Sequence, residues 1–173
     1  GGSIGNPSPA GPYNMVSRGS NHACSLRMDN TVICWGSDSE GQSSPTSGTF
    51  IDLAGGEGHT CGIRSDGSIG CWGSDAETQS SGYPTMVCDN DNSILCSSDP
   101  ECSLVSPGTC VTPVWTDISA GANNTCAITA DASMHCWGRD AEMQSSPPAG
   151  HFSQVSLAGE FGCAIEVDGA VVV

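Results

Sequence analysis

The chain has 173 residues, a net charge of −15 and a sequence pI near 4.1. This length corresponds to roughly one domain. The basic residues are four arginines without any lysine, so the chain would repel phosphate backbones, which argues against nucleic-acid binding. No apolar run is long enough to cross a bilayer, so we expect no membrane span.

The chain contains eleven cysteines, which is a large number for a protein of this size. The sequence contains no Cys-x-x-Cys, and its histidines do not flank cysteine pairs at zinc-finger spacing, which argues against a structural zinc site. The remaining explanation for the cysteines is that they form disulfides, which implies an extracellular protein. Residues 1–12, predicted as an N-terminal arm, lack the basic and apolar regions of a signal peptide. We therefore expect that a signal has been removed or precedes this sequence.

A unit of 37 residues begins at Tyr13 and recurs along the chain. The anchor cysteines Cys24 and Cys61 are 37 residues apart, as are Cys126 and Cys163. The interval between the second and third anchors is 65 residues, which is one unit plus an insertion of 28. The predicted organisation is repeats 1 and 2 over residues 13–83, a Cys-rich insertion over 84–111, and repeats 3 and 4 over 112–173.

Each complete unit predicts a β-hairpin whose register follows from its cysteines. A second cysteine stands ten residues after the anchor and opens a Cys-Trp-Gly in three units, at Cys34, Cys71 and Cys136. The hairpins centre on aspartates, with Asn30, Gly67, Ala132 and Gly169 at the turn position that favours positive φ, and alanine is the poor fit. In this register the two cysteines lie opposite each other, which predicts the disulfides Cys24–Cys34, Cys61–Cys71 and Cys126–Cys136.

One face of each hairpin also carries an aliphatic pair, for example Leu26 with Val32 and Ile165 with Val171. The other face carries a small residue after the anchor, which would allow another layer to approach closely; these residues are Ser25, Gly62, Ala127 and Ala164. Sheets covered on both faces by similar sheets are typical of propeller blades or solenoid layers. The predicted fold class is therefore all-β, with four propeller-type units of about three strands each.

The repeated pattern resembles that of the regulator of chromosome condensation family. The second unit carries the resemblance in Leu53-Ala54-Gly55-Gly56, His59-Thr60-Cys61, Asp66-Gly67, Cys71-Trp72-Gly73 and Gln79, and the third unit repeats it from Ile118 to Gln144. The resemblance implies a seven-bladed β-propeller, close to compact bacterial variants that include a propeller-type inhibitor of β-lactamase. The paired cysteines resemble those of secreted bacterial members. Family membership implies a binding scaffold and does not name what is bound.

Two departures from the family pattern concern the number and the completeness of the units. The sequence holds four units, so it would form an open arc or part of a larger propeller or assembly. In the fourth unit Val173 stands where the second cysteine is expected. Cys163 is left without an internal partner and is predicted as a candidate for an intermolecular link.

Motifs that could carry catalysis fail for reasons of context. Gly1-Gly2-Ser3-Ile4-Gly5 matches a nucleophile elbow, but Pro-rich sequence follows it where a helix would be needed. His22 and His59 precede anchor cysteines, and because other units have Asn124 and Phe161 there, we interpret them as structural hydrogen-bonding groups. The repeated carboxylates Asp38/Glu40, Asp75/Glu77 and Asp140/Glu142 are interpreted as solvated turns. We expect no enzyme activity and no cofactor.

The insertion contains four further cysteines, and disulfides are expected among Cys88, Cys96, Cys102 and Cys110 without a defined connectivity. Asp89 and Asp91 resemble the start of a calcium loop, but the positions for its glycine and glutamate hold Ile94 and Pro100, so a closed surface loop is the competing interpretation. Asn123 opens an N-glycosylation sequon.

Two function classes remain for this secreted or cell-surface chain. The first is a structural subunit that associates with its own copies, as a filament or surface assembly. The second is a monomeric propeller module that binds a protein or glycan and belongs to a longer chain.

Overall fold

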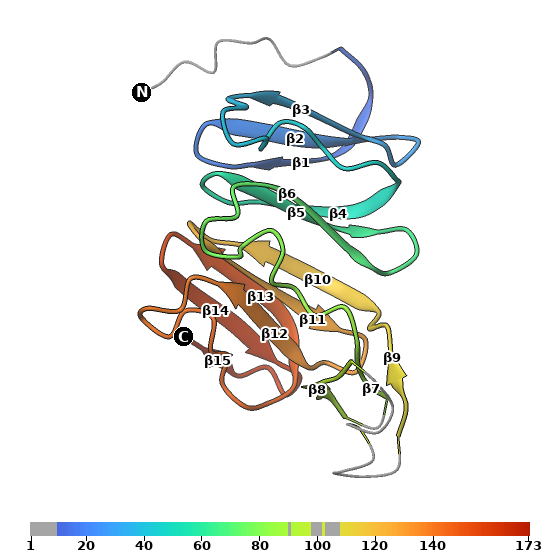
Figure 1. Cartoon of the computed structure of the whole chain (residues 1–173), viewed down its shortest axis with the longest axis vertical. Coiled ribbons are helices and arrows are strands. Elements are labelled where there is room, and N and C mark those ends of the chain that lie inside the picture. Colours follow the sequence, from blue (N-terminus) through green and yellow to red (C-terminus); the bar gives the residue numbers. More distant parts are fainter. Residues whose placement is uncertain (1–9, 90, 98–101, 103–107) are drawn as a thin grey trace.

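The structure, a computed structural model, describes residues 10–89, 91–97, 102 and 108–173. Four three-stranded antiparallel sheets, which we call blades 1 to 4, follow one another along the chain (Figure 1). Blade 1 comprises β1 (Tyr13–Arg18), β2 (His22–Arg27) and β3 (Val32–Gly36), and blade 2 comprises β4 (Phe50–Gly55), β5 (His59–Arg64) and β6 (Ile69–Gly73). Blade 3 comprises β10 (Trp115–Ala120), β11 (Asn124–Thr129) and β12 (Met134–Gly138), and blade 4 comprises β13 (Phe152–Ala158), β14 (Phe161–Glu166) and β15 (Val171–Val172).

The predicted hairpin register is confirmed in every blade. Cys24 lies opposite Cys34 and Leu26 opposite Val32, and the same pairs recur in blades 2 and 3. In blade 4, Ile165 lies opposite Val171. The structure places S–S bonds between the cysteines of Cys24–Cys34, Cys61–Cys71 and Cys126–Cys136.

The hairpin turns owe their shape to one aspartate and one residue of positive φ in each blade. The carboxylate of Asp29 accepts a hydrogen bond from the amide of Thr31 at 3.0 Å, and Asp66, Asp131 and Asp168 accept the corresponding bonds. The residues of positive φ are Asn30 at 64°, Gly67 at 85°, Ala132 at 72° and Gly169 at 93°. Ala132 thus adopts the shared turn in spite of its Cβ, because the strand pairing on both sides fixes the loop length.

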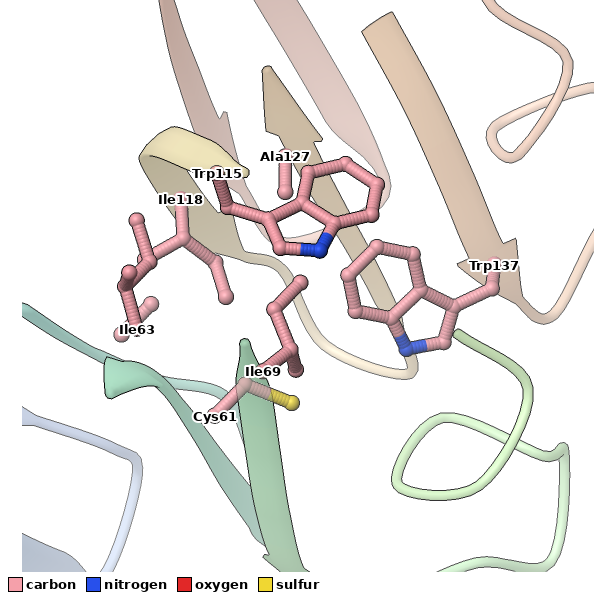
Figure 2. Close-up of a cluster of buried hydrophobic side chains, with 8 residues drawn as sticks. Cys61, Ile63, Ile69, Trp115, Ile118, Ala127 and Trp137 are labelled. Carbon is pink, nitrogen blue, oxygen red and sulfur yellow. The ribbon is translucent and has the colours of Figure 1, made fainter. Parts of the chain in front are cut away.

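Successive blades pack face to face, and their contacts form the core. One cluster joins Leu26 and the Cys24–Cys34 bridge of blade 1 to Phe50, Leu53 and Trp72 of blade 2. A second joins Cys61, Ile63 and Ile69 of blade 2 to Trp115, Ile118 and Trp137 of blade 3 (Figure 2). A third joins blades 3 and 4 through Ile128, Phe152 and Val155. The apolar side chains of the 37-residue unit are therefore buried between blades as much as within them.

The small residues after the anchor cysteines make room for the aromatic side chain of the blade's own first strand. A Cβ on Gly62 would lie 2.9 Å from Cδ1 of Phe50 and 2.6 Å from the carbonyl oxygen of Asp52. Ala127 is likewise fully buried and packs in the cluster that contains Trp115. At Gly62, both the backbone and the side chains of the blade's own first strand approach this face.

The insertion forms a fifth small sheet at the edge of the arc (Figure 1). It consists of β7 (Val87–Cys88), β8 (Asp91–Leu95) and β9 (Cys110–Val111), in the order β8-β7-β9. The structure pairs Cys88 with Cys102 and Cys96 with Cys110. Strands as short as β7 and β9 carry no hydrophobic period, so the sequence predicted only a closed loop here.

Candidate interaction surfaces

The junction between successive blades is built by the first strand of each blade. The amide of Gly55 in β4 donates to Oγ of Ser17 in β1 at 2.9 Å, and the amide of Leu157 in β13 donates to Oγ of Ser119 in β10 at 2.9 Å. Both bonds cross from one blade to the preceding one at the same repeat position. The first strands are thereby fixed side by side, and their C-terminal ends converge at one point.

Polar side chains buried at the junctions join the second strands of adjacent blades. Nε2 of His22 lies 2.7 Å from Oγ1 of Thr60, and Nε2 of His59 lies 2.8 Å from Oγ1 of Thr125. Burial, together with the nearby His22 and against the opposing effect of Asp75, lowers the pKa of His59 to about 4. Burial also lowers the pKa of His22. The two histidines are therefore neutral blade-to-blade links at neutral pH.

A slot for the repeated tryptophan forms another part of each junction. The indole Nε1 of Trp72 in blade 2 donates to the carbonyl oxygen of Gln42, which follows blade 1, at 3.0 Å. Trp137 in blade 3 donates in the same way to the carbonyl oxygen of Gln79 at 3.0 Å. The slot thus combines the apolar face of one blade with a single buried acceptor, which suits an indole.

The junction between blades 3 and 4 has a different donor at the equivalent acceptor. Its acceptor, the carbonyl oxygen of Gln144, receives a hydrogen bond from Nδ2 of Asn124 at 3.0 Å instead. A pocket of about 270 Å³ lies beside it, lined by Cys136, Val155 and Leu157 and by polar residues that include Ser146 and Glu160.

Among the described residues, both outer faces of the arc carry exposed apolar side chains. On blade 1, the side chain of Val16 is 65% exposed. On blade 4, Phe161 is 79% exposed and Val171 is 65% exposed, and the thiol of Cys163, outside any disulfide, is exposed beside them.

A hollow at the axial end of the arc is lined mainly by backbone. The glycines Gly19, Gly56, Gly121 and Gly159 border it, one from each blade. The amide of Glu57 donates to the carbonyl oxygen of Ala122, and the amide of Ala122 donates to that of Gly159 at 2.8 Å. Arg18, Ser20 and Glu57 also border the hollow.

Two inner-strand carboxylates lie close enough to influence each other. Burial raises the pKa of Asp52, the hydrogen bond from the Leu53 amide opposes this shift, and the Asp117 carboxylate raises it further. One oxygen of Asp117 accepts the amide of Val155 in the next blade at 2.7 Å. Asp117 thus links blades 3 and 4.

The carboxylates after each Trp-Gly hold turns, as the sequence suggested. Asp38 accepts the amide of Ser43 at 2.8 Å, and Asp75 and Asp140 accept the equivalent serine amides at 2.9 Å. Gln42 caps the same turn by accepting the amide of Glu40 through Oε1 at 2.8 Å. These aspartates therefore stabilise the loop that carries the carbonyl oxygen to which the tryptophan of the next blade donates.

The remaining sequence candidates occupy separate places. Both carboxylate oxygens of Asp89 bind Thr109 at 2.7 Å, so this side chain closes the insertion, while the side chain of its predicted calcium partner Asp91 lies outside the described residues. Asn123 is half-buried, and its sequon partner Thr125 is buried against His59. The motif at residues 1–5 also lies outside the described residues.

The sulfur atoms of Cys88, Cys96 and Cys102 lie within 4.8 Å of one another. They belong to the two adjacent disulfides of the insertion, and a metal requires free thiolates, so this cluster is not a metal site in the disulfide form. Across the described part of the chain, no helix has the length and apolar character needed to cross a bilayer.

Comparisons with known proteins agree with the repeat and the fold. The family profile described as the regulator of chromosome condensation (RCC1) repeat matches residues 16–42 and 115–142, which lie in and beyond blades 1 and 3. Curated protein sequences yielded no match. The disulfides and the repeat thus describe an RCC1-like β-repeat protein.

Solved structures of propellers are similar in fold to this chain. Human WBSCR16 has 18% sequence identity and a TM-score of 0.66, over 90% of this chain and 45% of its own. Yeast RCC1 (Prp20), solved bound to Kap60, has 15% identity and a TM-score of 0.66, over 95% and 44%. The CRINKLY WD40 ectodomain of the Arabidopsis thaliana receptor kinase ACR4 has 21% identity and a TM-score of 0.56, over 90% and 46%. The chain therefore spans less than half the length of each of these propellers.

Proposed function

We propose that this chain is a non-enzymatic extracellular β-repeat protein that acts as a structural subunit and associates with copies of itself. One observation carries the proposal: the two end faces of the arc expose Val16 on blade 1 and Phe161 with Val171 on blade 4. In the interior blades, the same repeat positions lie buried against a neighbour. Exposed apolar side chains on the outer faces of blades 1 and 4 are suited to association.

Five disulfides support an extracellular setting, since bonds of this kind persist in oxidising compartments. The unlike ends favour a head-to-tail contact, which closes as a ring or continues as a filament according to its rotation. A filament or surface assembly is the form that we propose for this chain.

Sedimentation velocity across a concentration series, combined with intact mass and electron microscopy of native material, tests the proposal. We expect the sedimentation coefficient to rise with concentration and ordered assemblies to be visible. A monodisperse monomer at all concentrations, with Cys163 fully open to alkylation, would contradict the structural role.

That outcome would favour a second candidate, a monomeric binding module for a protein or glycan within a longer chain. The length comparison favours it, since the similar propellers are about twice as long as this chain. One of them was solved bound to another protein. A glycan array probed with the monomer, and the intact mass of the native protein, would distinguish this module from the self-associating subunit.

A further inference from the structure

We propose that Asn123 carries an N-linked glycan, and that this glycan is attached before blade 3 packs on blade 2. The proposal rests on the extracellular setting proposed above and is independent of self-association. Asn123, Asn124 and Thr125 form the acceptor sequence Asn-x-Thr, whose middle residue is not proline. The place of the asparagine amide in the fold favours modification, and the place of the threonine hydroxyl determines when it occurs.

Asn123 is the last residue of the turn that joins β10 to β11 in blade 3. Its side chain is half-buried, and its backbone carbonyl oxygen accepts the amide of Arg139 at 2.9 Å. Across the described part of the chain, no hydrogen bond engages the side-chain amide of Asn123. A glycan on this nitrogen therefore breaks no hydrogen bond of the fold.

The equivalent positions in the other units show that the turn leaves room for a side chain. Asn21 holds this position in blade 1 and is exposed. In blade 2 the position is Gly58, and a Cβ built there would meet, among the described residues beyond its chain neighbours, one atom within 4 Å, the Cβ of Ser74 at 3.4 Å. In unit 3 Arg139 replaces this serine, and its guanidinium lies 3.6 Å from the carboxylate of Glu160 in the next blade. The side chain at this position thus points away from the packed strands.

Thr125 lies in a very different environment from Asn123. Its side chain is fully buried in β11, the central strand of blade 3, which pairs it with Ala120 on one side and Trp137 on the other. Its Oγ1 lies 2.8 Å from Nε2 of His59 in blade 2. The junction between blades 2 and 3 thus encloses the hydroxyl that completes the acceptor sequence.

The burial of this hydroxyl sets the order of modification and folding. The acceptor sequence requires the hydroxyl group as well as the asparagine, so both must be accessible to the transferase. Access ends when β11 packs on blade 2 and Thr125 contacts His59. The Cys126–Cys136 disulfide restricts access as well, because it fixes the hairpin directly beside Thr125. Attachment therefore precedes both events.

The transfer uses an oligosaccharide linked to a lipid diphosphate as its co-reactant. Nδ2 of Asn123 forms a bond to C1 of the first sugar while the bond between C1 and the phosphate oxygen breaks. The lipid diphosphate leaves, Nδ2 gives up one proton, and nothing is oxidised or reduced. The hydroxyl of Thr125 is not consumed, so it can still contact His59 when the junction closes.

Intact mass and peptide mapping of native material, before and after treatment with peptide N-glycosidase F, test the site. We expect the peptide that contains Asn123 to lose a glycan and to carry aspartate at this position after treatment. Asn21 is the matched control, because it holds the same turn position and is more exposed but has Ala23 where the hydroxyl is required. An unmodified Asn123 in secreted material with its disulfides formed would overturn the site and leave the extracellular assignment standing.

Three variants, secreted from a eukaryotic host with an added signal peptide, separate the acceptor sequence from the fold. Asn123→Gln and Thr125→Val should each lose the glycan, whereas Thr125→Ser keeps a hydroxyl and should retain it. Asn123→Gln should have an unchanged free energy of unfolding, since its side chain makes no hydrogen bond among the described residues. A glycan that persists in Asn123→Gln would overturn the assignment to this residue.

The proposed order is tested with the unglycosylated chain produced in a bacterial host. One sample is folded with its disulfides formed, the other is reduced and unfolded, and both are incubated with microsomal membranes that supply the lipid-linked donor. We expect at least about tenfold more glycan on the unfolded chain, because the folded chain must first open the junction between blades 2 and 3. Equal modification of both samples would overturn the order, and no modification of either would overturn the site.

Discussion

The junction between blades 2 and 3 and the outer face of blade 4 are built from the same 37-residue unit, yet they differ in how they are buried. At the junction, Ile63 and Ile69 of blade 2 pack against Trp115, Ile118 and Trp137 of blade 3 (Figure 2). On the outer face of blade 4, the residue equivalent to Ile69 is Val171, which is largely exposed. Burial in this fold is thus set by the neighbouring blade, and the unit alone does not complete its core.

Removing an interior tryptophan should give the largest effect. Trp137→Ala deletes a buried indole that packs in the blade 2–blade 3 cluster and donates to the carbonyl oxygen of Gln79, so we expect a loss of about 3–5 kcal/mol in the free energy of unfolding. Trp35→Ala, on the half-buried end face, should lose about 1–2 kcal/mol. Urea unfolding of dilute protein measures both losses. Equal losses would show that the interior tryptophan stabilises the fold no more than the one on the end face.

The anchor disulfide of an interior blade should have the next largest effect. Replacing Cys61 and Cys71 together by Ala opens a loop of about eleven residues, worth about 2.7 kcal/mol in the chain-entropy account. Cys163→Ser, at the exposed anchor of blade 4, should change the free energy of unfolding by less than about 0.5 kcal/mol. Thermal and urea unfolding provide the measurement.

Peptide mapping of the unmodified chain provides the control for this comparison. It should recover Cys61 joined to Cys71, as the hairpin register requires. Cysteines joined across different repeats would contradict both the register and the blade arrangement.

The sequence predicted the hairpins well because two constraints acted on the same residues. The cysteine spacing centred each hairpin, and the aliphatic pair placed one face against a neighbour, so the pairing of Leu26 with Val32 followed directly. The small sheet of the insertion escaped prediction because strands of two residues, such as β7, contain no period to detect.

Contacts between blades were harder to predict, since they depend on how one unit sits on the next. The partner of His22 is Thr60, 38 residues away, and the acceptor for Trp72 is a backbone carbonyl of Gln42. One signal was available in the sequence: where Asn124 replaces the histidine, Gly162 replaces the threonine. A paired change of this kind between adjacent units indicates a contact across the junction.

Acidification should weaken the interior junctions through His59. The unfolded chain binds a proton at this side chain near its ordinary pKa of 6.5, whereas the folded protein binds it only near pH 4, so lowering the pH between these values favours unfolding. From His59 alone, we expect the free energy of unfolding to be about 2 kcal/mol lower at pH 5 than at pH 7.5. His22 acts in the same direction, while the raised pKa of Asp52 acts in the opposite one.

The His59→Gln variant isolates this contribution, because glutamine can bond Thr125 without titrating. Urea unfolding at a series of pH values should show a flatter profile between pH 7.5 and pH 5 for the variant than for the unmodified protein. Parallel profiles would mean that His59 is not the group responsible, and that the interior junction does not depend on its neutral form.

The smallest expected effect comes from two hairpin turns of equal shape, one in interior blade 3 and one in terminal blade 4. Ala132 holds a φ of 72°, where its Cβ is strained, so Ala132→Gly should stabilise the protein by about 0.5–1 kcal/mol. Gly169 holds a φ of 93° with open space around it, so Gly169→Ala adds the same strain without a steric clash and should destabilise blade 4. If blade 4 unfolds together with the rest, the two changes in the free energy of unfolding will be equal and opposite. If the exposed blade opens separately, Gly169→Ala will leave the global unfolding free energy unchanged and will instead speed hydrogen exchange of the β14 amides, which is the result that the uncovered face predicts.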